Sequence, residues 1–296
     1  MNVLSLFDGM SCGQIALKKI GMKVNKYFAC EIKPHAIKVT KANFPNTIQL
    51  GDVTKVSAKD LPKIDLLIGG SPCQDFSTAN KVRLGLKGAK SSLFFEYLRL
   101  VQETKPKYFF LENVAMDKKS SDKISKLLGV QPVVINSKEV SGALRKRAYW
   151  TNIPFNGIKA KKKSPKLKKL LTHGYTEREK ARCVLEGDSR PLSNPVRMIN
   201  RYFNTGFTTL IFKDKNHYLA CQAYAHAMKG RPCSDIADGK IPDVIKGVRY
   251  MNQIEMERVQ TVPEGYTSKL SRDDSASLLG DGWTVDVIAQ FFKGIK

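Results

Sequence analysis

The chain has 296 residues, of which 42% are hydrophobic, so it can form one large domain or one domain with a smaller companion, and its composition is that of a globular protein. Fifty lysine and arginine residues against 27 aspartate and glutamate residues give a net charge of +23. This charge favours a polyanionic partner, and nucleic acid is favoured over a membrane because no basic amphipathic helix is evident. A lysine-rich proteome would give the same excess.

Neither a membrane span nor a secretion signal is evident in the sequence. No apolar run approaches the ~20 residues that a membrane span needs. Residues 1–7 lack a basic leader and are typical of a strand. We therefore expect a cytoplasmic protein without a membrane partner.

The cysteines are spread along the chain without a Cys-x-x-Cys pair, which predicts free thiols. They stand at positions 12, 30, 73, 183, 221 and 233. A zinc site is conceivable because four possible ligands lie close in sequence: His217, Cys221, His226 and Cys233. Their spacings match no standard zinc motif, and residues 220–228 fit an ordinary helix. We therefore predict no metal site.

The first half of the chain alternates short apolar runs with segments of helical pattern. Strands are predicted at residues 3–7, 27–31, 64–68 and 108–111. Helices are predicted at residues 12–20, 34–43 and 93–103, the second of them opened by a proline and stopped by another. This alternation indicates an α/β domain with a largely parallel sheet, whose ligand lies outside the carboxyl ends of the strands.

The composition changes after Pro154. Seven lysines stand between residues 159 and 169, and the pattern stays irregular to about residue 248, where the strand–helix alternation has ended. Helical periodicity returns at residues 251–259. We predict a first domain over residues 1–155, a smaller inserted domain over 156–248, and a return to the first domain over 249–296.

A glycine-containing turn follows the first strand, at residues 7–13, where α/β domains bind nucleotide-like cofactors. Glu31 follows about twenty residues later at the end of the next strand, where a carboxylate can accept hydrogen bonds from ribose hydroxyls. Asp52 follows a third strand-like segment and could accept the amino group of an adenine. These features alone would suit a dehydrogenase equally well.

Cys73 lies in the run Gly-Gly-Ser-Pro-Cys-Gln, residues 69–74, directly after a buried strand. A strand-end loop beside the cofactor turn would present a thiol, the most nucleophilic side chain near neutral pH. A single cysteine is more often a buried structural residue.

An acid and two arginines complete a possible reaction site. Glu112 and Asn113 follow the strand at 108–111, while Arg145 and Arg147 would face one way in a strand, although a surface pair is the simpler interpretation of their spacing. These groups suit the methylation of cytosine. A thiolate that adds at carbon 6 makes carbon 5 nucleophilic, a carboxyl group at nitrogen 3 stabilises the developing charge, and an arginine holds oxygen 2.

The order of these motifs resembles that of the DNA cytosine-5 methyltransferases, and the resemblance covers most of the chain. No single motif is decisive, but their joint occurrence in order is specific. They are Phe7-Asp8-Gly9 with Gly13; Glu31; Asp52; Pro72-Cys73-Gln74 with Ser77; Glu112-Asn113-Val114; Arg145-Lys146-Arg147; Met256 to Gln260 with Pro263 and Tyr266; and Leu279-Gly280 to Val287.

The resemblance implies a Rossmann-like class I methyltransferase domain with a mostly parallel seven-stranded sheet and an inserted target-recognition domain at residues 156–248. It implies S-adenosylmethionine as methyl donor, S-adenosylhomocysteine as product and double-stranded DNA as substrate. Cys73 would be the attacking thiolate, Glu112 would contact nitrogen 3 and the amino group, and Arg147, with Arg145 beside it, would contact oxygen 2. The cofactor-binding positions would be Phe7, Asp8, Gly9, Gly13, Glu31, Ile32, Asp52, Val53, Pro72 and Trp283.

The target carbon cannot be reached inside a stacked duplex, so the base has to be flipped out. The segment after the nucleophile is the predicted loop that enters the duplex, through Ser77, Lys81, Arg83, Lys87 and Lys90. A second set of predicted phosphate contacts is Lys161, Lys162 and Lys163, for which a solvated loop is the alternative.

Two departures from the family pattern affect the cofactor site. Ser11 stands where many bacterial members carry glycine, and Asp281-Gly282-Trp283 stands where they usually carry Asn-x-Val, which gives some likeness to the animal de novo methyltransferases. We expect a monomeric bacterial or phage enzyme, with a restriction endonuclease partner left open.

Other functions are less consistent with the sequence. An RNA cytosine-5 methyltransferase would share the scaffold, but those relatives carry a Cys-Phe-Thr run in the target region that this sequence lacks. A non-catalytic DNA-binding regulator predicts a damaged thiol or acid motif, and both motifs are intact. A nicotinamide enzyme would leave Cys73, Glu112 and Arg147 unexplained.

Overall fold

The computed structural model describes residues 1–71, 92–158, 164–185, 195–206, 208–229 and 242–296. Two compact units share the chain. Unit 1 comprises Met1–Glu139, Arg145–Lys161 and Gly282–Lys296, and unit 2 comprises Val140–Leu144 and Lys162–Asp281. Among the described residues, no helix is both long and apolar enough to span a membrane.

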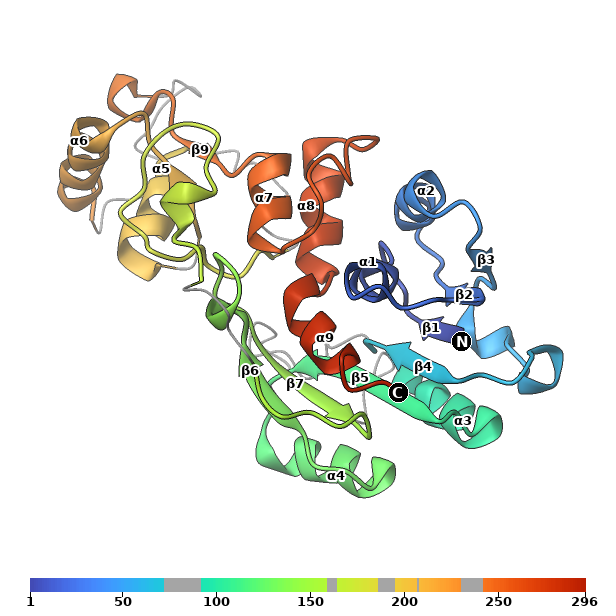
Figure 1. Cartoon of the computed structure of the whole chain (residues 1–296). Coiled ribbons are helices and arrows are strands. Elements are labelled where there is room, and N and C mark those ends of the chain that lie inside the picture. The colour runs from blue at the N-terminus through green and yellow to red at the C-terminus, as the bar shows by residue number, and fades with distance from the viewer. Residues whose placement is uncertain (72–91, 159–163, 186–194, 207, 230–241) are drawn as a thin grey trace. The chain divides into compact units, whose positions relative to one another are not determined.

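Unit 1 is built on a seven-stranded sheet of order β3-β2-β1-β4-β5-β7-β6 (Figure 1). The strands β3, β2, β1, β4 and β5 run parallel, whereas β7 is antiparallel to both of its neighbours. The mostly parallel seven-stranded α/β fold predicted from the sequence is therefore confirmed. The strands are β1 (Asn2–Leu6), β2 (Lys26–Cys30), β3 (Ile48–Gln49), β4 (Leu66–Gly69), β5 (Tyr108–Val114), β6 (Val133–Asn136) and β7 (Lys146–Thr151).

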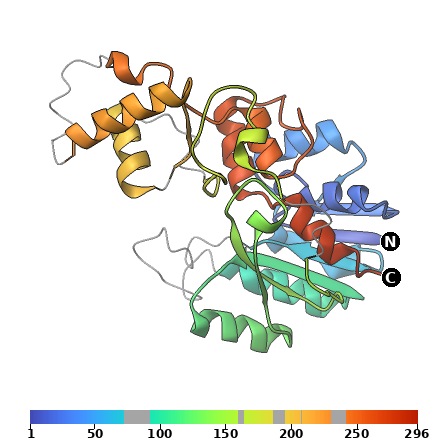
Figure 2. The ribbon, with the colours of Figure 1, turned by 60° about the vertical axis from the view of Figure 1, so that its left-hand side comes forward.

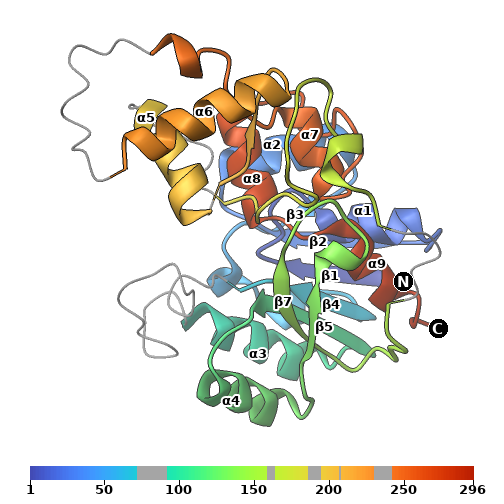
Figure 3. The same cartoon turned by 90° about the vertical axis from the view of Figure 1, so that its left-hand side faces the viewer.

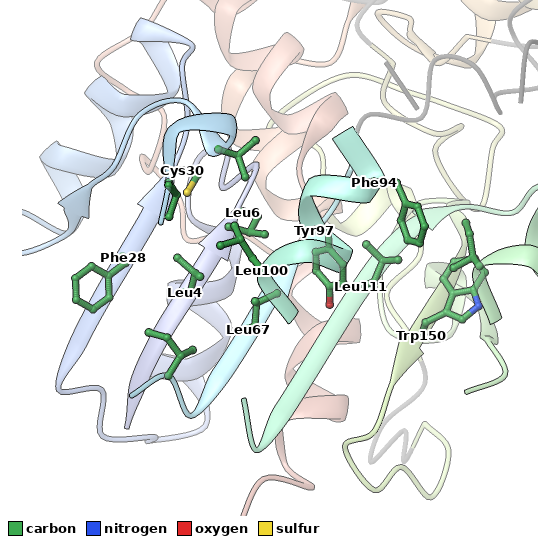
Figure 4. Close-up of a cluster of buried hydrophobic side chains, with 14 of the residues drawn as sticks. Leu4, Leu6, Phe28, Cys30, Leu67, Phe94, Tyr97, Leu100, Leu111 and Trp150 are labelled. Carbon is green, nitrogen blue, oxygen red and sulfur yellow. The ribbon is translucent and has the colours of Figure 1, made fainter. Parts of the chain in front are cut away.

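Helices cover both faces of this sheet (Figure 3). On one face, α3 and α4 pack on alternate strand residues such as Leu4, Leu67 and Leu111, as Figure 4 shows for α3. On the other face, α1 packs against α9, and the rings of Phe291 and Phe292 in α9 contact Phe110 of β5. The helices of unit 1 are α1 (Cys12–Lys19), α2 (Pro34–Asn43), α3 (Ser92–Thr104), α4 (Lys118–Leu128) and α9 (Val285–Phe292).

Unit 2 contains a two-stranded antiparallel sheet and a small apolar core. The core includes Ile199, Tyr202, Phe212 and Cys221, and α5 and α6 lie against each other around it (Figure 2). Its elements are α5 (Pro195–Asn200), the π-helical turn Arg201–Thr205, β8 (Leu210–Ile211), α6 (Lys215–Ala227), β9 (Arg249–Tyr250), α7 (Gln253–Val259) and α8 (Arg272–Asp281). Short 3-10 turns in the two units span Val53–Lys55, Ala58–Asp60, Ser137–Glu139, Leu167–Lys169 and Asp243–Ile245.

The boundaries of the units differ from the predicted ones at the second junction. The sequence places the return to the first domain at residue 249, whereas the compact units keep residues 249–281 in unit 2. The buried carboxylate of Glu255 supplies a physical reason. It pairs with Arg249, with N···O distances of 2.7 and 2.8 Å, and accepts hydrogen bonds from the backbone and hydroxyl of Thr172, both at 2.8 Å. Three segments of unit 2 therefore meet at Glu255.

Two of the residues considered for zinc make other contacts. The ring of His217 and the thiol of Cys221 both reach the carbonyl oxygen of Val244, at 3.0 and 3.2 Å. Cys233 lies outside the described residues. Within the part of the chain that the structure describes, no three potential ligands cluster in a metal-binding arrangement.

Candidate active site

The turn after β1 brings the first predicted cofactor motif to the carboxyl end of the sheet. Phe7, Gly9 and Ser11 all have left-handed backbone conformations, with φ of 56°, 57° and 60°. Only glycine adopts this conformation at little cost, so Phe7 and Ser11 carry local strain that the surrounding contacts have to offset. Gly13, one residue into α1, lets this helix approach β4, since a Cβ there would lie 2.3 Å from Ile68 Cδ1.

Asp8 holds the turn against the neighbouring strand. Its carboxylate accepts hydrogen bonds from the hydroxyl of Tyr27 in β2, at 2.8 Å, and from the hydroxyl of Ser11. Burial raises the pKa of Asp8 to about 6, although these hydrogen bonds oppose the shift. Tyr27 was not identified from the sequence, where it was only one apolar residue of a predicted strand.

Glu31 and Asp52 lie after β2 and β3, which are neighbours in the sheet. Glu31 Oε2 accepts the backbone N–H of Gly9 at 2.8 Å, while Oε1 accepts those of Ile32 and Lys33. Both hydrogen bonds that Asp52 accepts go to Oδ1, from Thr54, and they lower its pKa.

The surroundings of these two carboxylates fit a nucleoside. Each carboxylate oxygen can accept more than one hydrogen bond, so both residues retain acceptor capacity. Ile32 beside Glu31 is 71% exposed and offers an apolar surface for a base. Two other predicted cofactor residues also contribute to the core, since Val53 is buried in it and Phe7 packs against it.

Glu112 is the centre of a buried polar cluster on the α9 face of the sheet. Arg147 Nε lies 3.1 Å from Glu112 Oε1, and the indole N–H of Trp283 donates to Oε2 at 3.0 Å. The predicted acid and one predicted arginine are thus in contact. Arg145 directly precedes β7 and is buried. Burial raises the pKa of Tyr149, and the positive charge of Arg145 opposes this rise.

Asn113 ties the end of β4 to β5. Its side-chain amide donates to the hydroxyl and the carbonyl of Ser71, at 3.1 and 3.3 Å, and its Oδ1 accepts the N–H of Val114 at 2.8 Å. Ser71 is two residues before Cys73 in the sequence. Ser71, which precedes the predicted nucleophile, therefore lies beside β5, the strand that carries the predicted acid.

Ten predicted site residues lie outside the described part of the chain. They are Pro72, Cys73, Ser77, Lys81, Arg83, Lys87, Lys90, Lys161, Lys162 and Lys163.

Two further cysteines of unit 1 are described, and neither resembles a nucleophile. Cys12 and Cys30 are buried, and burial raises the pKa of each thiol to about 12. Cysteine reacts as the thiolate, so these two thiols are inert near neutral pH. The thiol of Cys12 instead makes a hydrogen bond with the backbone of Trp283.

Known methyltransferases resemble this chain in sequence. Residues 1–129 match the family model described as C-5 cytosine-specific DNA methylase. The type II methyltransferase M.NgoBV of Neisseria gonorrhoeae is 36% identical over 200 residues, covering 58% of this chain and 46% of that protein. The orphan methyltransferase M.SPRI of Bacillus phage SPR is 40% identical over 116 residues, covering 38% of this chain and 26% of that protein. The chain thus matches less than half the length of these curated relatives.

Solved structures share the fold over the whole chain. The Entamoeba histolytica methyltransferase EhMeth has a TM-score of 0.70 at 15% identity and covers 100% of this chain and 99% of its own. DNMT2 of Spodoptera frugiperda has a TM-score of 0.68 at 18% identity and covers 99% of this chain and 98% of its own. Identities this low concern the fold alone. The match of residues 1–129 to the C-5 cytosine-specific DNA methylase model agrees with the resemblance that the motifs indicated.

Proposed function

We propose that this protein transfers a methyl group from S-adenosylmethionine to carbon 5 of a cytosine in double-stranded DNA, through a covalent adduct of Cys73 with the base. The observation that carries the proposal is the contact between Arg147 and Glu112, at 3.1 Å, on the strand that also holds Ser71 through Asn113. An acid and an arginine are paired where the segment leading to a cysteine begins. A thiol, an acid and an arginine together supply the groups that cytosine methylation needs.

Cys73 is the thiol in unit 1 that suits this role. The other cysteines of this unit, Cys12 and Cys30, are held protonated by burial. The family motif contains Cys73, and the match to the family model covers it.

The proposed reaction divides its work among three side chains. The Cys73 thiolate adds to carbon 6, and the electron pair of the 5,6 double bond moves towards nitrogen 3. Glu112 protonates or hydrogen-bonds nitrogen 3 and accepts a hydrogen bond from the amino group, while Arg147 donates a hydrogen bond to oxygen 2. Carbon 5 is then nucleophilic. After alkylation, loss of its proton and expulsion of the Cys73 thiolate restore the aromatic ring.

The turn after β1 and the ends of β2 and β3 would hold the cofactor, which supplies an electrophilic methyl group. Glu31 would accept hydrogen bonds from the ribose hydroxyls, Ile32 would contact the adenine face, and Asp52 would accept the adenine amino group. Glu31 also accepts the N–H of Gly9, so ribose binding and the shape of the turn are coupled.

Double-stranded DNA is the proposed partner because of the net charge of +23 and because the family model that matches residues 1–129 is described as a DNA methylase. A flipped cytosine would enter the site, since carbon 6 is inaccessible within a stacked duplex. We further propose that unit 2 recognises the target sequence, that the lysines at 161–163 contact phosphates, and that the protein acts as a monomer in the cytoplasm.

A trapping experiment tests this function. The purified chain, S-adenosylmethionine and plasmid DNA from a methylation-free host are expected to give 5-methylcytosine at defined sites. DNA carrying 5-fluorocytosine at such a site should form a stable adduct, because elimination needs loss of a proton that fluorine replaces. C73A should abolish both results and retain cofactor binding, since the thiol acts only on the base.

Cys183, a partly exposed cysteine of unit 2, provides the matched control, and C183A should behave as the parent. Methylation by C73A at the parental rate would refute the assignment. If the protein methylated RNA and left DNA unmodified, RNA would replace DNA as the proposed substrate.

A further inference from the structure

Trp283 and Glu112 are 171 positions apart in sequence, yet they share a buried hydrogen bond. Trp283 Nε1 donates to Glu112 Oε2 at 3.0 Å, while Arg147 Nε lies 3.1 Å from the other oxygen. Glu112 and Trp283 are 7% and 9% exposed. The indole N–H donates to Oε2, whereas Arg147 forms an ion pair with Oε1, which accepts no hydrogen bond from the described residues and keeps its acceptor capacity.

The indole has little freedom to move from this position. Its ring meets the edge of Phe110, with centroids 5.7 Å apart and an interplanar angle of 69°. Phe110 and Glu112 are two apart on β5 and therefore face the same side of the sheet. The backbone N–H of Trp283 also donates a hydrogen bond to the sulfur of Cys12 in α1.

Gly70, directly after β4, provides the space for this contact. A Cβ at this position would lie 2.9 Å from Trp283 Nε1 and 3.2 Å from Glu112 Oε2. A side chain there would separate the donor from the acceptor. The segments that carry Gly70, Glu112 and Trp283 thus meet at Glu112 Oε2.

We propose that Trp283 is a positioning residue for methyl transfer, acting through Glu112 rather than as a wall of the cofactor site. This inference rests on the proposed function, in which Glu112 meets nitrogen 3 and the amino group of the cytosine. With Oε2 hydrogen-bonded to the indole and the charge of Arg147 beside Oε1, the carboxylate is oriented before the base arrives. Preorganised groups accelerate the chemical step, so Trp283 contributes to kcat.

The substitution W283F removes the indole N–H and keeps an aromatic ring against Phe110. Loss of one hydrogen bond to a charged group is expected to lower kcat about tenfold or more. The dissociation constant for S-adenosylmethionine, measured by calorimetry, should change less than about threefold. In an E112A background, W283F should cause no further loss in the rate of adduct formation with 5-fluorocytosine DNA.

The other tryptophan is the matched control. Trp150 is fully buried, and its indole N–H donates to the hydroxyl of Ser125 at 2.9 Å. W150F should destabilise unit 1 and leave kcat unchanged. A parental kcat in W283F would overturn the proposal. So would a loss of cofactor affinity as large as the loss of kcat/KM, because that would make Trp283 a cofactor contact.

A spectroscopic test separates this proposal from the proposed function. In W150F, Trp283 is the single tryptophan of the chain, so its emission reports its surroundings. E112A should change that emission, whereas E96A, at a partly exposed position of α3 that pairs with Arg99, should not. An emission unaffected by E112A refutes the contact even if the enzyme methylates DNA. An inactive parent refutes the proposed function and leaves this comparison intact.

Discussion

The carboxyl group of Asp8 should make the stability of unit 1 depend on pH in an unusual direction. Most native carboxylates have lowered pKa values and stabilise a fold as the pH rises. Burial instead raises the pKa of Asp8 from 3.8 to about 6, and the charge of Glu31 adds to this effect. The hydroxyl groups of Tyr27 and Ser11 stabilise the ionised form but do not offset the burial.

Between pH 4 and 6 the folded state retains a proton on Asp8 that the unfolded chain has lost. Stability therefore falls as the pH rises through this window, is unaffected by Asp8 below it, and stays reduced above it. A shift of about two units, at 1.36 kcal/mol per unit, corresponds to at most about 3 kcal/mol. D8N removes this titration, so the variant should gain stability relative to the parent as the pH rises from 4 to 7.

Tryptophan emission during urea unfolding measures this difference in the relevant unit. Both tryptophans of the chain, Trp150 and Trp283, belong to unit 1, so their emission does not report on unit 2 directly. Y27F provides a second check, because it removes the 2.8 Å donor to Asp8 and should extend the pH-dependent window to higher pH. A difference between D8N and the parent that stays constant from pH 4 to 7 would refute the reasoning.

Three further predictions concern packing, the anchor of unit 2 and the partner. G13A should lower the melting temperature of unit 1 and cost about 1–3 kcal/mol, because the new Cβ would lie 2.3 Å from Ile68 Cδ1. E255Q should destabilise unit 2 by about 2 kcal/mol, measured by hydrogen exchange, because it leaves Arg249 without its charge partner. The control E264Q, in an exposed ion pair, should change stability by under about 1 kcal/mol. DNA affinity should fall steeply between 50 and 200 mM salt, roughly by a power law, if the lysine-rich segments contact phosphates, and an affinity insensitive to salt would remove them from the interface.

The apolar pattern located β5 in the sequence but placed its end too early. The prediction stopped that strand at Leu111, and the structure continues β5 through Glu112 and Asn113 to Val114. Polar residues carry no strand signal in a buried sheet, so the pattern could not include them. Pairing with β7 explains the continuation, since Val114 and Arg147 are partners in the register.

The contacts between distant segments could not be predicted from the sequence, for a different reason. Glu255 and Trp283 each have partners far along the chain, and nothing in their local pattern names Thr172 or Glu112. The motif order predicted which residues belong to the site. It assigned Trp283 to the cofactor because the family resemblance places that segment there, whereas the hydrogen bond to Glu112 is visible only in three dimensions.

The continuation of β5 has a consequence for the proposed reaction. Successive residues of a strand point to opposite faces, so Glu112 and Asn113 reach different partners from adjacent positions. Glu112 meets Arg147 and Trp283, while Asn113 holds Ser71 at the start of the segment that leads to Cys73. Pairing on both sides of β5 fixes its register, so neither residue can shift along the strand without the other. The strand therefore sets the position of the acid and the origin of the nucleophile segment together, and a change in either contact should affect the same catalytic step.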